Sequence, residues 1–240
     1  MTTQIISDIH FPYQDDKAVN IALKINQKMR PAEVIINGDM LDFPQVSRFT
    51  MDPDVHQTLE RDINMSIEFI KKLQRYSSVT VIEGNHEIRL NKYILENAPE
   101  LKSLVSLEAI LSNNLDDDIK YIDAIGKESM YWYDDSILIG HFNRVSKNSA
   151  YTAKLLVEQY KCNIIQAHVH RLGSHYFTGY KETLVGFEMG CLCSIYPEYM
   201  AKPNWQQGFL MYNRIGSNTE IETIHIADGK ALYRGKEYRG

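Results

Sequence analysis

Short apolar runs recur along the first 170 residues, and each run ends in an Asp, His or Asn. The run Val79–Ile82 is rich in β-branched residues and stops at Glu83-Gly84, a pattern that predicts a buried strand followed by a sharp turn. That turn presents Asn85 and His86. Four other runs end in the same manner, at Asp8 and His10, at Asp39 and Asp42, at His141, and at His168 and His170.

These polar endings are expected to converge. The carboxyl ends of parallel strands lie along one edge of an α/β sheet, which is where such folds gather ligands. The side-chain period of a strand is two, so both polar ends of an Asp-x-His or His-x-His segment can point to one place. A single histidine in such a position is more often a structural residue, but five ordered endings favour a chemical site.

The residues between these runs follow helical spacing. Ala18, Ala22, Ile25 and Met29 predict an amphipathic helix over Asp16–Met29, which Pro31 ends. The same spacing predicts helices from about Asp54 to Arg75, from Leu90 to Leu111 with a break near Pro99, and from about Ser149 to Tyr160. Strands and helices therefore alternate, as in a layered α/β fold.

The C-terminal third reads mainly as strands. Ser129–Tyr133 and Ser136–Ile139 are predicted to pair through a turn at Asp134-Asp135. Further short runs follow at Thr183–Phe187, Gly208–Tyr212, Glu220–Ile226 and Ala231–Tyr233. We expect this tail to complete a second, mixed sheet. No linker or shift in composition interrupts the chain, so residues 1–240 are expected to form one domain.

Composition narrows the class of protein. The chain is 44% hydrophobic and 24% charged, with a formal net charge of −5, which is ordinary for a soluble globular protein. A mildly acidic chain argues against tight, sequence-independent binding to long duplex DNA. We expect neither a signal peptide nor a membrane span, because Met1-Thr2-Thr3-Gln4 leads directly into the first strand and no apolar run is long enough.

The three cysteines favour a reduced, cytoplasmic setting over a disulfide framework, because they are few and odd in number. Cys191 and Cys193 form a C-x-C pair that can bind metal. No further ligands follow at the spacing of a zinc finger, so we favour small buried residues on a strand.

Taken in order, the polar endings read Asp-x-His, Gly-Asp-x-x-Asp, Gly-Asn-His-Glu, Gly-His and His-x-His over residues 8–170. In this order and completeness the chain resembles the calcineurin-like metallophosphoesterase superfamily, in the compact form found in bacteria and their viruses. Two positions depart from the usual pattern, Ile139 before Gly-His and Ala167 before His-x-His, and neither removes a ligand atom. The resemblance implies a layered α-β-β-α sandwich of two mixed sheets flanked by helices, with a dinuclear metal site at the strand ends.

The resemblance also implies a ligand set. Asp8, His10 and His170 would hold one divalent cation, Asn85, His141 and His168 the other, and Asp39 would bridge the two. Mixed ligation by His, Asp and Asn suits Mn, Fe, Zn or Ni better than Ca. We expect manganese first among these.

Two such cations make a bridging water a hydroxide near neutral pH and neutralise charge on phosphoryl oxygens, so hydrolysis of phosphate esters is the natural reaction. In the family the histidine that matches His86 protonates the leaving oxygen or stabilises the transition state. Asp42 would orient His86, and Arg89, with Arg144 and Arg171 as further candidates, would grip the phosphate. His175 can reach the rim of the site, with no assigned role.

The sequence leaves the substrate open. The aromatic stretches Phe11-Pro12-Tyr13 and Tyr176–Tyr180, with the insert Phe43–Val55, can shape a pocket that stacks a base or a sugar. We therefore favour a phosphodiester in a nucleotide or a nucleic-acid strand. The alternatives are a phosphomonoesterase and a Ser/Thr protein phosphatase. An inactive binding scaffold is a weaker alternative, because such proteins usually lose metal ligands and none is missing here. The oligomeric state is not predicted.

Overall fold

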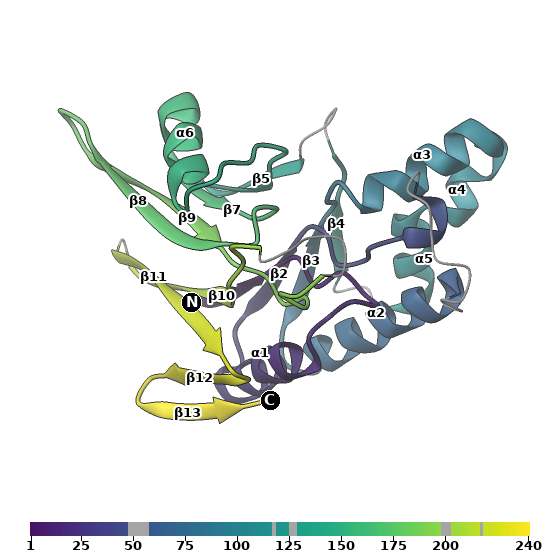
Figure 1. Cartoon of the computed structure of the whole chain (residues 1–240), viewed down its shortest axis with the longest axis horizontal. Coiled ribbons are helices and arrows are strands. Elements are labelled where there is room, and N and C mark those ends of the chain that lie inside the picture. The colour runs from purple at the N-terminus through teal and green to yellow at the C-terminus, as the bar shows by residue number, and fades with distance from the viewer. Residues whose placement is uncertain (48–57, 117–118, 125–128, 198–202, 217) are drawn as a thin grey trace.

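Two sheets face each other in the computed structural model of this chain, and helices cover their outer faces (Figure 1). The structure describes residues 1–47, 58–116, 119–124, 129–197, 203–216 and 218–240. Within these residues the larger sheet has eight strands in the order β13-β12-β11-β10-β1-β2-β3-β4, and the smaller has five in the order β5-β6-β7-β9-β8.

The strands of the larger sheet are β1 (Thr2–Ile6), β2 (Glu33–Asn37), β3 (Ser78–Ile82), β4 (Ile119–Ile122), β10 (Gln207–Ile215), β11 (Asn218–Ala227), β12 (Lys230–Tyr233) and β13 (Lys236–Arg239). Those of the smaller sheet are β5 (Ser129–Asp134), β6 (Ile137–His141), β7 (Asn163–Gln166), β8 (Leu172–Thr178) and β9 (Thr183–Met189). The helices are α1 (Asp16–Met29), α2 (Leu59–Gln74), α3 (Glu87–Asn97), α4 (Lys102–Val105), α5 (Leu107–Asn114) and α6 (Tyr151–Tyr160), with short 3₁₀ turns η1 (Pro44–Val46) and η2 (Pro99–Leu101).

Alternating side chains divide the core into layers. On β2, Ile35 belongs to the cluster between the two sheets, whereas Val34 and Ile36 pack with α1 and α2 on the outer face. On the other side, α6 covers the smaller sheet through a cluster that includes Leu156. This arrangement confirms the predicted α-β-β-α sandwich of two mixed sheets.

Local signals set the helix ends. Helix α1 has the predicted bounds: the Asp15 side chain accepts a hydrogen bond from the Ala18 N–H (2.9 Å), and Arg30 ends the helix in a left-handed conformation. Helix α2 begins at Leu59, where Thr58 caps it; the predicted start at about Asp54 lies outside the described residues. The predicted break near Pro99 is confirmed, because α3 ends at Asn97 and η2 follows.

The prediction for the C-terminal tail was wrong in part. Strands β8 and β9 do complete the smaller sheet, but β10 pairs antiparallel with β1 and, with β11 to β13, extends the larger one. Strand β1 needs a partner on its second edge, and β10, buried from Gln207 to Tyr212, supplies it. Periodicity identifies a strand but not the edge that it joins. Strands β4, β8 and β13 were not predicted, because β4 and β13 have only 4 residues each and β8 begins with Leu-Gly-Ser-His, so none contains a clear apolar run.

No helix in the part of the chain that the structure describes is both long and apolar enough to cross a membrane.

Candidate metal centre

The ends of five strands carry the predicted site residues. Strands β1, β2 and β3 pair in parallel, and Asp8, Asp39 and Asn85 lie just beyond them. In the facing sheet His141 is the last residue of β6, and His168 follows β7. The remaining predicted residues lie further along the same loops, and they are His10, Asp42, His86 and His170.

Backbone geometry shapes these loops. The N–H groups of Asp8 and His10 donate to the carbonyls of Gly38 (3.1 Å) and Asp39 (3.0 Å), so pairing continues past the ends of β1 and β2. Five predicted ligands have a left-handed backbone, with φ values of 50° at Asp8, 54° at His10, 50° at Asp39, 76° at His168 and 56° at His170. Residues other than glycine rarely adopt this conformation, and such strain is concentrated at functional sites.

One half of the cluster brings together Asp8, His10 and His170. The His170 Nε2 atom lies 3.1 Å from Asp8 Oδ1 and 3.2 Å from His10 Nε2. All three residues are buried. These contacts place together the three residues expected to share a cation.

The other half contains Asn85, His141 and His168. The His141 Nε2 atom lies 3.0 Å from Asn85 Oδ1, and the rings of His141 and His168 are 5.1 Å apart between centroids. Asp39 lies between the two halves, because its Oδ2 atom is 3.2 Å from His141 Nε2 and 3.7 Å from His10 Nε2.

The residues fit a metal centre. Ligand atoms of Asp39, His141 and His168 all lie within 4.8 Å of one another, as do those of His10, Asp39 and His86. The Asp8 Oδ1 atom is buried and forms no hydrogen bond of good geometry among the described residues, although His170 Nε2 lies 3.1 Å away. In addition, His10 and His170 face each other through ring nitrogens, an arrangement that needs a proton or a cation between them. Imidazole and carboxylate donors of this kind suit first-row transition metals.

Charge compensation shifts the pKa values of these buried groups. Burial opposes ionisation of Asp39, but His141 and His86 outweigh it and hold the pKa of this carboxyl well below its usual range. Burial also opposes the charged form of His141, and Asp39 outweighs it and raises the pKa of His141 to about 10. Burial and then the charge of His141 lower the pKa of His168 to about 4. Cations can take the place of the protons that balance the carboxylates.

His86 lies at the edge of the cluster with Asp42 and Arg89. The Asp42 Oδ1 atom is 2.8 Å from His86 Nδ1, the contact predicted from the sequence. The same oxygen lies 3.0 Å from His10 Nδ1, which was not predicted. Arg89 Nη1 donates to the Asp42 carbonyl (3.0 Å), and its Nη2 lies 3.0 Å from His86 Nε2. Asp42 therefore contacts both a predicted ligand and the predicted proton donor.

In the described part of the chain, the hydrogen bonds of the other candidates go to residues outside the cluster. Arg171 donates to the carbonyls of Asn204 (3.1 Å) and Ser146, so its guanidinium joins two loops. The Arg144 side chain is exposed, and its carbonyl accepts a hydrogen bond from Gln166. His175 lies in the middle of β8 opposite Gly186.

Sequence reasoning gave no role to Glu87, although the Gly-Asn-His-Glu motif contains it. This buried carboxylate accepts hydrogen bonds from the N–H groups of Asp39 (2.9 Å), Leu41 (2.8 Å) and Gly84 (2.8 Å). Burial and then the Asp39 carboxylate raise the pKa of Glu87 to about 7, against the effect of these hydrogen bonds. Glu87 thus joins the loop after β2 to the loop after β3.

Cys193 was also missed. All three cysteines are free and buried, as expected, but Cys191 and Cys193 form isolated bridges and not a regular strand. The Cys193 Sγ atom lies 3.7 Å from His170 Nδ1. No local signal in the sequence links these two residues.

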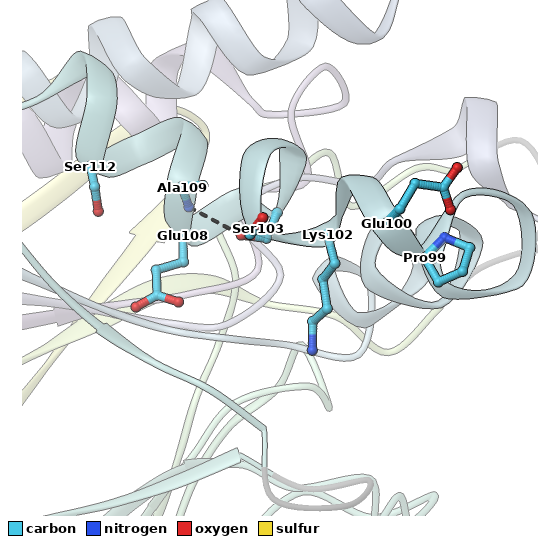
Figure 2. A pocket seen from close by; sticks show the side chains of 8 residues that line it. Pro99, Glu100, Lys102, Ser103, Glu108, Ala109 and Ser112 are labelled. Carbon is cyan, nitrogen blue, oxygen red and sulfur yellow. Dashed lines mark hydrogen bonds between the residues drawn. The ribbon is translucent and has the colours of Figure 1, made fainter.

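A separate pocket lies on the helical segment η2–α5, where Pro99, Lys102 and Ala109 are among its lining residues (Figure 2). None of its described lining residues belongs to the predicted site. The chemistry-bearing side chains and this pocket are therefore on different elements.

Comparison with known proteins gives the family. The calcineurin-like phosphoesterase family matches residues 1–188 of this chain. The gene 54 protein of Mycobacterium phage L5 is 28% identical over 97% of this chain and 96% of its own length. The gene 54 protein of Mycobacterium phage D29 is also 28% identical, over 94% of each chain.

Among solved structures, wild-type Vps29 from Entamoeba histolytica, described as a complex with zinc, covers 100% of this chain and 98% of its own, with a TM-score of 0.50 and 14% identity. This likeness shows a shared fold. The match over residues 1–188 and the buried His/Asp clusters lead to one conclusion. The chain belongs to the calcineurin-like phosphoesterase family.

Proposed function

We propose that this chain is a phosphodiesterase that acts on a nucleotide or a nucleic-acid strand and needs two divalent cations. Asp8, His10 and His170 hold one cation, Asn85, His141 and His168 hold the other, and Asp39 bridges them. The observation that carries this proposal is the place of Asp39 Oδ2, within 3.7 Å of His10 and 3.2 Å of His141. Family membership and the complete ligand set support it.

When bound, the two cations supply a water nucleophile at neutral pH and neutralise the charge that develops on phosphoryl oxygens. We propose manganese as the native metal. Zinc is the first alternative, because the structurally similar Vps29 is described as a zinc complex.

The remaining roles follow from contacts around His86. We assign His86 Nε2 as the proton donor to the leaving oxygen, because Asp42 holds the other ring nitrogen at 2.8 Å. Arg89 Nη2 lies 3.0 Å from His86 Nε2, and because a guanidinium can only donate, this group turns to the transferred phosphoryl group when His86 Nε2 carries its proton. Its backbone contact to Asp42 keeps the guanidinium at this position.

One aromatic ring that packs on the cluster, and a second that closely follows a cluster residue in the chain, support a substrate that contains a base. Tyr13, three residues beyond His10, is 42% exposed, and Trp205 packs on His170 with 4.3 Å between ring centroids. Such rings can stack a base or sugar next to the scissile phosphate. The part of the Phe43–Val55 insert from residue 48 onward lies outside the described residues and contributes nothing to this proposal.

The test is a substrate screen with added manganese or zinc on the wild type and on His86→Asn. The substrates are aryl and alkyl phosphodiesters, aryl monoesters, cyclic nucleotides, single- and double-stranded nucleic acid and a phosphopeptide. His225→Asn, at an exposed histidine on β11, is the matched control.

We expect the highest turnover on a nucleotide or nucleic-acid diester. His86→Asn should lower turnover about a hundredfold or more on poor leaving groups and less on nitrophenol esters, with both cations retained. Preference for monoesters or the phosphopeptide would identify a phosphatase instead. A wild type that binds metal but hydrolyses nothing would support the binding scaffold.

A further inference from the structure

His170 has different partners at its two ring nitrogens. Its Nε2 atom faces the cluster, 3.1 Å from Asp8 Oδ1 and 3.2 Å from His10 Nε2. Its Nδ1 atom lies 3.7 Å from the sulfur of Cys193. Ligand atoms of His10, His170 and Cys193 all lie within 4.8 Å of one another, so Cys193 adjoins this half of the cluster and meets His170 at its second ring nitrogen.

The position of Cys193 is itself tied to the same half of the cluster. The backbone N–H groups of Leu192 and Cys193 both donate to the carbonyl of Asp8, at 3.1 and 3.0 Å. The Gln207 side chain donates to the Cys193 carbonyl at 2.9 Å. The segment that places the sulfur against His170 thus also holds the backbone of Asp8, a second residue proposed to bind the same cation.

The tautomer of His170 gives this contact a direction. Nε2 can bind a cation only through its lone pair, so Nδ1 must then carry the proton and needs an acceptor. The Cys193 sulfur, 3.7 Å from this nitrogen, is placed to accept its hydrogen bond. The sulfur of the neighbouring Cys191 donates to the Gln206 carbonyl at 3.6 Å.

We propose that Cys193 is a positioning residue for the metal centre, whose sulfur accepts the Nδ1–H of His170 and so keeps Nε2 free and aimed at the cation shared with Asp8 and His10. This inference rests on the metal assignment proposed above. Partners of this kind typically change metal affinity by about 10–100-fold. Only one of the two cations should be affected, because the other is assigned to residues that Cys193 does not contact in the part of the chain described here.

The test measures metal binding and not turnover. The full chain is stripped of metal, and zinc stoichiometry and affinity are measured by titration for the wild type, Cys193→Ala and Cys193→Ser. Cys162→Ala is the matched control, because this buried thiol packs under α6 with Leu138 and Leu156. Nitrogen NMR of the zinc-loaded wild type reports the tautomer of His170.

We expect Cys193→Ala to weaken one zinc by about 10–100-fold and to leave the other unchanged. Cys193→Ser should restore most of the affinity, because a hydroxyl oxygen also accepts a hydrogen bond. Cys162→Ala should bind both ions as the wild type does. The wild-type spectrum should show His170 protonated at Nδ1.

Several results would overturn the proposal. Equal affinity in Cys193→Ala, or a His170 proton at Nε2 in zinc-loaded wild type, would show that the sulfur does not set the ring. A sulfur-to-cobalt charge-transfer band in the cobalt-substituted wild type, lost in Cys193→Ala, would make Cys193 a direct ligand. If the wild type bound neither zinc nor manganese, the proposed metal-dependent function would be wrong as well. Equal affinity in Cys193→Ala, or a His170 proton at Nε2, would contradict only the role of Cys193 and would leave the proposed function intact. If a variant fails to fold, the NMR spectrum of the zinc-loaded wild type still shows which nitrogen of His170 carries the proton and so tests the proposal.

Discussion

Gly84→Ala should disrupt the cluster without changing any polar group in it. A Cβ atom at this position would lie 2.2 Å from Asp39 Oδ1, 2.3 Å from Asp39 N and 2.8 Å from Glu87 Oε2. Ordinary contacts of a Cβ begin near 3.4 Å. The two strand-end loops must therefore separate by about 1 Å, and the side that moves carries the proposed bridging carboxylate.

The magnitude follows from this displacement. Overpacking a tight site costs about 1–3 kcal/mol, and a misplacement of about 1 Å in catalytic geometry can cost about a hundredfold in rate. We expect Gly84→Ala to unfold at a lower urea concentration, to lose at least one cation and to fall about a hundredfold in turnover.

The assay combines urea denaturation, metal analysis and turnover of an aryl phosphodiester. Gly179→Ala is the matched control, because its Cβ would meet nothing closer than 3.5 Å, and it should stay within about 0.5 kcal/mol of the wild type. If Gly84→Ala kept two cations and wild-type turnover, the packing of Asp39 against the loop after β3 would not hold the site, and the reasoning would be refuted.

Two further changes test contacts that the sequence did not reveal. Asp42→Asn should lower both turnover and cation affinity, because Asp42 contacts His10 as well as His86. If this variant bound both cations with wild-type affinity, the contact between Asp42 and His10 would not contribute to metal binding. Glu87→Ala should destabilise the fold by about 3 kcal/mol or more, since each of three buried N–H donors left unsatisfied costs about 1–3 kcal/mol. Urea denaturation measures this loss of stability, with Glu68→Ala on the exposed face of α2 as the control. Equal urea midpoints for Glu87→Ala and Glu68→Ala would contradict the prediction.

The sequence predicted the features that depend on local pattern. Helix α1 has the predicted bounds because its apolar spacing, its Asp15 cap and Pro31 all agree. The residues at the strand ends meet because parallel strands bring their carboxyl ends to one edge, and this holds whatever the loops contain.

Features that depend on long-range pairing were beyond the sequence. Cys193 reaches His170 through contacts between the segment after β9 and the loop after β1, and neither residue type nor spacing encodes that contact. Strand β10 joins the larger sheet because β1 has an open edge there, whereas its periodicity fits either sheet. Asp42 was assigned one partner because the chain order gave no reason to expect a second.

Asp39 is proposed to join two cations in one site. Elemental analysis of the metal-loaded wild type, Asp39→Asn and the exposed control Asp135→Asn, with turnover measured on the same samples, tests it most directly. We expect two cations per chain in the wild type and the control, and the loss of at least one cation and of activity in Asp39→Asn, because a neutral amide cannot balance two cations. Two cations and normal turnover in Asp39→Asn, or a wild type that binds no cation, would show that Asp39 does not bridge a dinuclear site.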